Sequence, residues 1–344
     1  MKQNHRAAVL SAVKQIQIDR HQFPVLQPSE AIVQVQFAGV CGTDIALFSG
    51  DYPVPLPLVL GHEFVGEVVE VGSEAGEGWL GERVTAEINN TCLAYQREVF
   101  CLACGRGLAN HCTERTVVGI INYDGAYAEY VRVPIANLHV IPSGISWETG
   151  VFIEPLAAAI QTFELTPLFP SDTVVVLGVG RLGLLICAVA ALREARVCAV
   201  SKSQAKLDRA IAWGADEAIC ANRSDWTEAV RQWSGGLGAD VVVEVTGSPD
   251  GLRLASKIIR PRGTIALKTT CGLPATGIDV TKLVVDEVQI HTSRCGQFSK
   301  AIGVLSRANL PFNSLISEVF PLDKVTHALE YAQTATKVLI EPNR

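Results

Sequence analysis

The segment from Thr173 to Ala195 constrains the fold more than any other part of the chain. Thr173–Leu177 is a nearly continuous apolar run, as expected for a strand buried on both faces. The glycine pattern Gly178-Val179-Gly180-Arg181-Leu182-Gly183 follows, and then the helical stretch Leu184–Ala195. Glycine permits a tight turn and close approach to a pyrophosphate, and the helix N-terminus offers unpaired N–H groups. We therefore expect this unit to bind a dinucleotide.

A glycine pattern by itself is often an ordinary turn, so its surroundings decide its meaning. Further buried runs follow, separated by helical patterns such as Ala205–Trp213. The runs are Arg196–Val200, Glu217–Cys220, Asp240–Val245, Thr264–Leu267 and Val288–His291. With Thr173–Leu177 they make six strands, which predicts an α/β fold with a parallel, doubly wound sheet.

The N-terminal half has a different texture. Strand patterns at Ala31–Phe37, Phe64–Val71 and Ala126–Val133 predict an antiparallel β domain with long loops. At about one domain per 150 residues, a chain of 344 residues suggests two domains. The last stretch adds a predicted helix, Lys324–Thr334, and a final strand, Lys337–Ile340.

The net charge and the cysteine content narrow the range of possible functions. The formal net charge is −6 without long runs, so nothing favours nucleic acid as a partner. The sequence shows neither a signal-peptide core nor an apolar stretch of about 20 residues. We therefore expect neither a secretory nor a membrane role. Four of the ten cysteines crowd one segment. Because a large chain does not need disulfides, these cysteines fit metal ligands in a reducing cytoplasm better.

Two short motifs indicate a catalytic metal. The first is Cys41-Gly42-Thr43-Asp44 and the second is Gly61-His62-Glu63. A thiolate and an imidazole are ligand types that zinc prefers, and a carboxylate lies beside each. A lone histidine in a β domain is more often structural, so the assignment of His62 depends on the other motifs.

The crowded cysteines are Cys92, Cys101, Cys104 and Cys112. Four thiolates can close a tetrahedral zinc with no open position, which is the pattern of a structural site. The alternative is a group of buried cysteines without metal.

The second predicted strand of the dinucleotide domain indicates which cofactor is bound. NAD sites usually place an acidic residue about 20 residues past the glycines. Here the strand ends without one, and Ser201, Lys202 and Lys206 stand nearby. A hydroxyl and lysines suit a 2′-phosphate, which favours NADP over NAD. The alternative is that both lysines are merely solvated.

Together these motifs resemble the zinc-containing alcohol dehydrogenases of the medium-chain dehydrogenase/reductase superfamily, over essentially the whole chain. Glu154-Pro155-Leu156-Ala157 and Val243-Glu244-Val245-Thr246-Gly247 carry the resemblance further. The most similar branch contains polyol, glucose and threonine dehydrogenases, in which a Glu-Pro motif replaces a third catalytic cysteine.

The resemblance implies a domain organisation. Residues 1–154 would form a GroES-like distorted β-barrel catalytic domain with a structural-zinc lobe at 90–113. Residues 155–297 would form a Rossmann domain that binds NAD(P), and 298–344 would return to the catalytic domain. Family members are usually homodimers or homotetramers, and by analogy Val288–His291 would pair across a subunit interface.

The resemblance also implies roles for single residues. Cys41, His62 and Glu154 would bind the catalytic zinc, with Glu63 as an occasional or water-mediated ligand. Asp44 would orient His62, and Thr43 would relay the substrate proton, unless it is a turn threonine bonded to its own backbone. Thr246 and Lys337 would contact the cofactor, Lys337 at its phosphates.

Two departures from the family pattern stand out. Many relatives carry a histidine five residues after the ligand cysteine, where this chain has Ala46. Relatives also separate their first two lobe cysteines by two residues, whereas Leu93–Phe100 intervene between Cys92 and Cys101. We interpret this stretch as a bulging insertion. Glu98 as a substitute ligand, or a lobe without metal, remains open.

The leading hypothesis is reversible oxidation of a small alcohol to an aldehyde or ketone, with hydride passing to NADP or NAD. Two alternatives stay open. One is a zinc-independent reductase of activated double bonds, of the enone or quinone type. The other is a zinc- and nucleotide-binding protein without catalysis, which Ala46 and the altered lobe keep in view.

Overall fold

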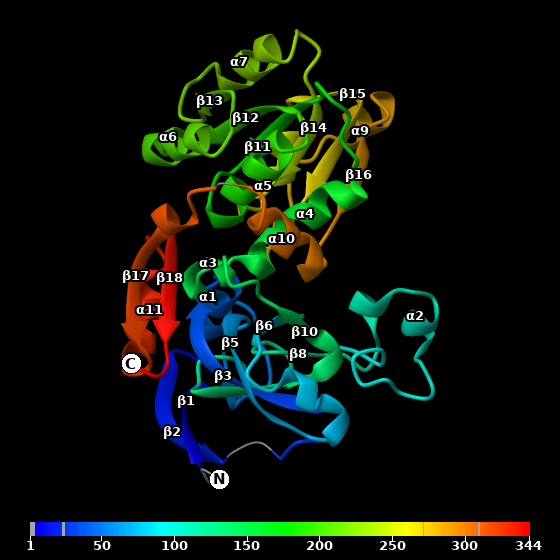
Figure 1. The fold of residues 1–344 in the computed structure, drawn as a ribbon. Coiled ribbons are helices and arrows are strands. Elements are labelled where there is room, and N and C mark those ends of the chain that lie inside the picture. Colours follow the sequence, from blue (N-terminus) through cyan, green and yellow to red (C-terminus); the bar gives the residue numbers. More distant parts are fainter. Residues whose placement is uncertain (1–3, 23–24, 271, 309) are drawn as a thin grey trace. The chain divides into compact units, whose positions relative to one another are not determined.

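The computed structural model describes residues 4–22, 25–270, 272–308 and 310–344, so Cys271 lies outside the described residues. The chain forms two compact units (Figure 1). Unit 1 comprises Met1–Glu154 and Phe298–Arg344, and unit 2 comprises Pro155–Gln297. Among the described residues, no helix is long and apolar enough to cross a membrane.

Unit 1 is rich in short strands. Its strands are β1 (Asn4–Ala12), β2 (Gln15–Gln22), β3 (Glu30–Gly39), β4 (Leu58–Val59), β5 (Glu63–Val71), β6 (Arg83–Ala86), β7 (Asn89–Asn90), β8 (Thr116–Val117), β9 (Tyr130–Pro134), β10 (Leu138–Val140), β17 (Ile316–Pro321) and β18 (Lys337–Glu341). Its helices are α1 (Gly42–Ser49), α2 (Leu102–Gly105), α3 (Trp147–Gly150), α10 (Phe298–Leu305) and α11 (Val325–Tyr331). Short 3₁₀ turns lie at Glu74–Trp79, Ala109–His111, Ile135–Asn137, Phe312–Leu315 and Leu322–Lys324.

The main sheet of unit 1 has the order β10-β6-β5-β3-β18-β17, and β9 also pairs with β3. A three-stranded sheet, β2-β1-β4, and the small pair β7-β8 complete the strands. Most pairs are antiparallel, as predicted, but β17 and β18 run parallel. The sequence analysis missed β17, whose residues are mostly half-buried or exposed and therefore show no buried apolar run.

Unit 2 contains one six-stranded sheet flanked by helices. Its strands are β11 (Thr173–Leu177), β12 (Arg196–Ser201), β13 (Glu217–Cys220), β14 (Ala239–Glu244), β15 (Ile259–Leu267) and β16 (Gln289–Thr292). Its helices are α5 (Arg181–Ala191), α6 (Gln204–Ala212), α7 (Trp226–Trp233), α8 (Gly251–Ala255) and α9 (Val280–Val285), with α4 (Ile153–Leu165) beginning just before the unit does.

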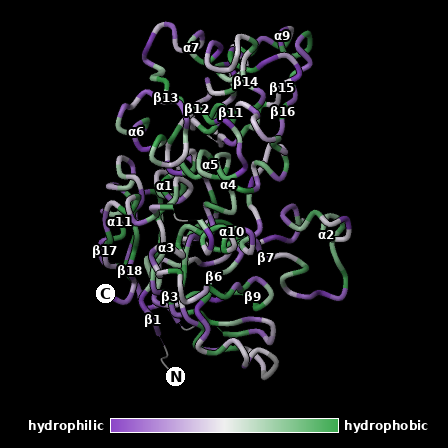
Figure 2. The backbone as a smooth tube through the Cα atoms, turned by 45° about the horizontal axis from the view of Figure 1, so that its top comes forward, coloured by the Kyte–Doolittle hydropathy of each residue, from purple (hydrophilic) through white to green (hydrophobic). Residues whose placement is uncertain are grey.

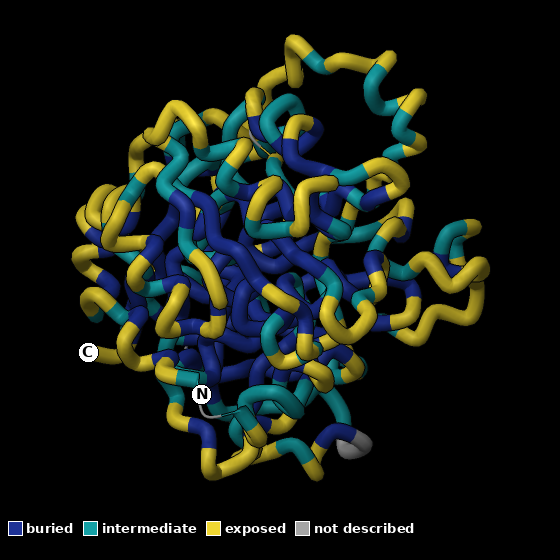
Figure 3. Tube along the Cα trace, turned by 90° about the horizontal axis from the view of Figure 1, so that it is seen from above, coloured by how far each residue is buried: buried dark blue, intermediate teal, exposed yellow. Residues whose placement is uncertain are grey.

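The strand order is β13-β12-β11-β14-β15-β16, and every neighbouring pair is parallel. This is the predicted doubly wound sheet, which reverses its winding between β11 and β14. The central strand β11 is buried along its whole length because neighbours flank it and helices cover it. Figure 2 shows hydrophobic residues along this central region, and Figure 3 shows exposed residues concentrated in the connecting turns.

The predicted helix Leu184–Ala195 begins earlier in the structure, at Arg181 inside the glycine pattern. Gly178 has φ +102°, a left-handed conformation that favours glycine. A Cβ atom at Gly178 would stand 2.8 Å from Thr246 Cα in the loop after β14. The first glycine therefore permits both the turn and the close packing of two loops at the carboxyl edge of the sheet.

Candidate active site

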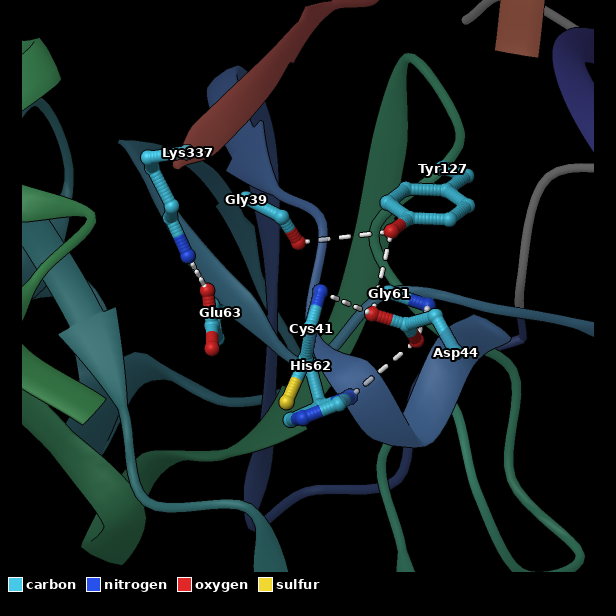
Figure 4. Close-up of polar contacts among 8 residues, drawn as sticks. All are labelled: Gly39, Cys41, Asp44, Gly61, His62, Glu63, Tyr127 and Lys337. Atoms are coloured by element: carbon cyan, nitrogen blue, oxygen red, sulfur yellow. Dashed lines mark hydrogen bonds and ion pairs between the residues drawn. The ribbon is translucent and has the colours of Figure 1, made fainter. Parts of the chain in front are cut away.

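Antiparallel pairing brings the two metal-binding motifs together. β3 ends at Gly39, which pairs with Glu63 at the start of β5. Cys41 lies just beyond the end of one strand, and His62 lies just before the start of the other. The ligand atoms of Cys41, His62 and Glu63 all lie within 4.8 Å of one another (Figure 4). The tertiary structure thus unites residues that are 21 positions apart in the sequence.

Asp44 links the two motifs from a fully buried position in the first turn of α1. Its Oδ2 accepts the Cys41 backbone N–H at 2.8 Å, and its Oδ1 accepts the Gly61 N–H at 3.3 Å. The same Oδ1 lies 3.3 Å from His62 Nδ1. The carboxylate therefore contacts the Cys41 backbone and the His62 ring together, an arrangement that suits support of two metal ligands.

The buried charges of this group shift one another's pKa values. Burial acts against the charged form of each side chain, but the opposing charges outweigh it. Burial would raise the pKa of Cys41, yet His62 brings it below its ordinary value. Burial would likewise raise the pKa of Asp44, and His62 again lowers it. The pKa of His62, which burial would lower, is raised well above its ordinary value by Asp44 and Cys41.

These residues fit a zinc ion. Cys41 offers a thiolate whose pKa is already lowered. With Nδ1 of His62 beside Asp44, the opposite ring nitrogen is left to bind metal. One thiolate, one imidazole and one carboxylate are the donor set of a catalytic zinc site with an open position.

Glu63 has a partner that the sequence analysis did not anticipate. The Lys337 ammonium forms an ion pair with Glu63 Oε2, and both side chains are almost fully buried. β18 pairs with β3, and Val40 donates to the Val338 carbonyl, which places Lys337 beside the metal motifs. A Cβ atom at Gly39 would stand 2.5 Å from Glu63 Oε2 and 2.6 Å from Lys337 Nζ. The absence of a side chain at Gly39 leaves space for the pair in this position.

Burial lowers the pKa of Lys337 to about 8, although the charges of Cys41 and Asp44 raise it. The ammonium also lies 5.6 Å from the centre of the Phe152 ring. Lys337 was expected to contact the cofactor phosphates. In the structure its buried amino group pairs with Glu63, a member of the candidate metal group.

The remaining predicted residues of unit 1 lie close by. Glu154 is the second residue of α4 and is half-buried, and its charge raises the pKa of Cys41. It does not belong to the group of described donor atoms within 4.8 Å of one another. Thr43 is half-buried in the first turn of α1, and the structure describes no hydrogen bond from its hydroxyl. Ala46 lies one turn further along the same helix.

Tyr127 is a site residue that the sequence analysis missed. Its side chain is fully buried, and its hydroxyl lies 3.1 Å from Asp44 Oδ2 and 3.3 Å from the Gly39 carbonyl. Tyr127 follows the glycine of Asp124-Gly125-Ala126, and no motif marks it in the sequence. Its role depends on a contact across 83 residues.

The four lobe cysteines converge in unit 1. Their sulfur atoms lie within 4.8 Å of one another, with Cys92 and Cys112 3.6 Å apart and Cys101 and Cys112 3.7 Å apart. Backbone N–H groups of Cys104 and Thr113 lower the pKa of Cys101 to about 5. None of these four cysteines forms a disulfide. Four converging thiols without disulfides fit a structural zinc.

The eight residues between Cys92 and Cys101 form turns and irregular structure, and α2 lies in a lobe that projects from unit 1 (Figure 1). Glu98 is exposed in the loop and is not among the converging donors. An ion pair of 2.7 Å joins Arg97 to Glu114, and Tyr95 lies 3.4 Å from Glu30 of β3. These contacts join the middle of the loop to Glu114 and to β3.

In unit 2 the predicted cofactor residues gather at the carboxyl edge of the sheet. Gly178 and Val179 connect β11 to α5, Gly180 caps that helix, and Arg181, Leu182 and Gly183 form its first turn. Ser201 ends the neighbouring strand β12, and its Oγ accepts the Ser203 N–H at 3.3 Å. Lys202 and Lys206 are exposed beside it. No carboxylate occupies the end of β12.

Thr246 lies beside the glycine turn in the loop after β14. Its backbone N–H and hydroxyl both donate to the buried Glu244, at 2.9 and 2.6 Å. The hydroxyl in turn accepts the Ser248 N–H at 3.0 Å. This network fixes the loop that packs on Gly178.

Comparison with known proteins agrees with this architecture. The family described as "Alcohol dehydrogenase GroES-like domain" matches residues 27–143, and "Zinc-binding dehydrogenase" matches residues 182–309. The chain is 28% identical to sorbitol dehydrogenase of Bacillus subtilis, with 99% of this chain and 98% of the relative covered. It is 32% identical to L-threonine 3-dehydrogenase of Bacillus licheniformis, with 89% of each covered.

Solved structures show the same similarity. A Sinorhizobium meliloti protein, described as a zinc-binding dehydrogenase and bound to NADP, matches with a TM-score of 0.89 and 28% identity. The match covers 98% of this chain and 99% of that one. This protein therefore has a GroES-like domain and a Rossmann domain, and it uses zinc and a nicotinamide cofactor. The chain belongs to the zinc-dependent alcohol dehydrogenases of the medium-chain dehydrogenase/reductase superfamily.

Proposed function

We propose that this enzyme oxidises neutral alcohols, with polyols as the first class to test, through a zinc site held by Cys41, His62 and Glu154. The convergence of the half-buried Cys41 with the buried His62 and Glu63 carries this proposal. The polyol class is supported by relatives named as sorbitol dehydrogenase and D-xylulose reductase. The buried Phe48 and the proline-rich loop 53–57 provide few charged groups for an ionic substrate.

The third zinc ligand is a choice between two carboxylates. Glu63 is closer to the other ligand atoms, but its charge is already engaged by Lys337. Glu154 is near enough to act on Cys41 electrostatically. We therefore assign Glu154 as the third zinc ligand. In this assignment Glu63 is a nearby carboxylate that does not bind the zinc directly.

The chemistry divides between the metal and the chain. Zinc, when bound, supplies a Lewis acid that favours loss of the alcohol proton. Asp44 holds the Cys41 backbone and the His62 ring. The structure describes no hydrogen bond from the Thr43 hydroxyl. This hydroxyl accepts the substrate proton and passes it on. Ala46 cannot continue this relay, so the proton leaves by another route.

We propose that NADP is preferred over NAD. At the end of β12, Ser201 with the exposed Lys202 and Lys206 supports a 2′-phosphate, and no carboxylate is present to bind the ribose 2′-hydroxyl. Comparison of kcat/KM for NADP and NAD tests this preference. A higher value for NAD would contradict it.

The main experiment is a panel of alcohols, polyols and carbonyl compounds with both cofactors, followed by the absorbance of the reduced nicotinamide. Zinc content is measured on the same samples. Turnover of polyols that is lost in the Cys41→Ser variant supports the proposal. Turnover that persists after zinc removal would favour the double-bond reductase, and silence with cofactor binding intact would favour a protein without catalysis.

We propose a homodimer or homotetramer in which two copies of β16 meet. β16 is the last strand of its sheet, and Ile290 on it is 41% exposed. Val284 and Val285 of the neighbouring α9 are 70% and 73% exposed. An uncovered sheet edge beside exposed valines favours pairing with a second copy. Light scattering measures the oligomeric state. A monomeric protein, with the same mass before and after Ile290→Lys, would contradict the proposal.

We also propose a cytoplasmic location. The support is chemical, because the four clustered thiols of the lobe persist best in a reducing compartment. Fractionation of cells that express the protein tests it, and recovery outside the cytoplasm would contradict it.

A further inference from the structure

Lys268 connects three segments at the carboxyl edge of the unit 2 sheet. It directly follows β15, and its backbone N–H donates to the Glu244 carbonyl of β14 at 2.8 Å. Its half-buried side chain reaches α4, where Nζ lies 3.1 Å from the Ala158 carbonyl. It also reaches the segment after β16, with the Ser293 carbonyl at 3.1 Å, Ser293 Oγ at 3.0 Å and the Arg294 carbonyl at 3.4 Å.

The chemistry of these contacts indicates a fastening role. An ammonium has three N–H donors and no acceptor, and here it faces three carbonyl oxygens and one hydroxyl. Hydrogen bonds from a charged donor are stronger than neutral ones. Because the oxygens belong to α4 and to the segment after β16, the charge of Lys268 draws these two segments together.

Two independent contacts show that the segment after β16 is seated on α4. A Cβ atom at Gly296 would stand 2.0 Å from the Ala157 carbonyl oxygen, so the two backbones touch. At the other end of α4, Thr166 Oγ1 lies 3.3 Å from Nδ1 of His291 in β16. Lys268 acts between these two contacts.

The sheet order indicates which part of the cofactor lies near these segments. A dinucleotide spans the carboxyl edge of a doubly wound sheet, with one nucleotide over each half. The glycine turn after β11 and Ser201 at the end of β12 serve the adenosine half. The loops after β15 and β16 lie over the other half of the sheet, where this arrangement would place the nicotinamide nucleoside.

We propose that Lys268 is a positioning residue for the nicotinamide half of the cofactor. It holds the segment 293–296 against α4, so that the loops after β15 and β16 are ordered before the ring arrives. Pre-ordering of a binding loop improves affinity because the ordering entropy is not lost on binding. This inference rests on nicotinamide-dependent oxidoreduction as the function.

The test compares two ligands in binding titrations of the zinc-loaded protein. The first is the reduced cofactor, and the second is the matching ADP-ribose, which lacks only the nicotinamide ring. Loss of one charged hydrogen-bond cluster predicts that Lys268→Met binds the reduced cofactor about tenfold more weakly. The same variant should bind the ADP-ribose as tightly as the unmodified protein does.

Three further variants sharpen the experiment. Lys257→Met is the matched control, because Lys257 is exposed in the same unit. Lys268→Arg keeps the charge and should restore part of the lost affinity. Gly296→Ala pushes the segment off α4 by a different route and should weaken reduced-cofactor binding in the same selective way. It also provides the test if Lys268→Met does not fold.

Selective weakening in Lys268→Met or Gly296→Ala supports the proposal. Equal weakening of both ligands would overturn it, because general destabilisation of unit 2 has no preference for the nicotinamide ring. Unchanged binding of both ligands would overturn it as well. If the unmodified protein bound the ADP-ribose and the reduced cofactor with equal affinity, the nicotinamide function itself would be in error, which is a separate result.

Discussion

Asp44 binds neither the substrate nor, in our assignment, the metal, yet it contacts Cys41, Gly61, His62 and Tyr127. An asparagine at this position keeps one acceptor oxygen and replaces the other by an amide that cannot accept. We predict that Asp44→Asn lowers zinc affinity about 10- to 100-fold, as expected for loss of support to a ligand. Competition with a chromophoric chelator measures the affinity.

Asp51→Asn is the control for this substitution, since Asp51 is exposed just past α1 and its carboxylate accepts a hydrogen bond from the Ser49 hydroxyl. It should leave zinc affinity unchanged. Equal affinities in Asp44→Asn and Asp51→Asn would show that the ligands hold their geometry without Asp44.

The Lys337–Glu63 pair concerns the state of the protein before metal binds. Removing one partner of a buried pair costs about 3 to 5 kcal/mol. We predict a loss of this size in the zinc-free Lys337→Met variant, because the Glu63 carboxylate is left buried without a cation. Zinc should restore more stability to this variant than to the unmodified protein, since Glu63 is then free to act as a ligand.

Urea unfolding with and without zinc measures both quantities. The double variant Lys337→Met/Glu63→Gln provides the control, because it removes the stranded charge together with its partner. A zinc-induced gain in Lys337→Met no larger than in the unmodified protein would mean that Glu63 does not reach the metal.

At the scale of elements, the lobe around α2 depends on Cys92 arriving from beyond an eight-residue loop. We predict that Cys92→Ser reduces the zinc content from two ions per chain to one, because three thiolates hold zinc less well than four. Glu98→Gln should keep both ions, since Glu98 is exposed and outside the donor group. Atomic emission on purified protein decides between Cys92 and Glu98 as the fourth ligand.

Asp240, at the amino edge of the unit 2 sheet, predicts that the stability of the protein depends on pH. Asp240 accepts the Thr173 N–H and hydroxyl at 2.8 and 2.6 Å and pairs with Arg260 at 2.6 Å. Burial would raise the pKa of Asp240, but Thr173 and Arg260 lower it below its ordinary value of 3.8. A lowered carboxyl pKa contributes stability above the unfolded pKa, and this is lost as the pH falls through the folded pKa.

Asp240→Asn should therefore lower the free energy of unfolding by about 1 to 2 kcal/mol near neutral pH. The difference from the unmodified protein should shrink as the pH falls below about 4, because the carboxyl protonates first in the unfolded state and, at lower pH, in the folded state as well. Melting temperatures across pH measure this. A difference that persists unchanged in acid would contradict the role of the Asp240 charge.

At the scale of the whole molecule, the two units have separate cores. The unit 2 core consists of residues from its own strands and helices, such as Val175, Val242 and Ile265. We predict that zinc removal abolishes turnover but leaves binding of the reduced cofactor within about twofold, because no predicted zinc-binding residue supports the unit 2 sheet. Fluorescence of the bound cofactor in zinc-free protein measures this, and loss of binding on chelation would show that the metal also maintains unit 2.

Local patterns were enough to predict much of the fold. Buried parallel strands are short apolar runs, and a glycine turn before a helix needs no distant partner, so Thr173–Leu177 and Gly178 could be identified from the sequence. Exposed or half-buried elements such as β17 could not, because adjacent Ser317 and Glu318 interrupt its short apolar pattern.

The sequence by itself determined which chemical groups are available: the thiols, the imidazole, the carboxylates and the glycine turn. The tertiary structure decided how they are paired. Lys337 meets Glu63 only because β18 pairs with β3, Tyr127 reaches Asp44 across the fold, and Lys268 reaches α4 and the segment after β16. A long-range contact between two polar side chains leaves no periodic trace in the chain. Its partners can be identified only in the folded protein, where polar groups are removed from water and buried charges are paired.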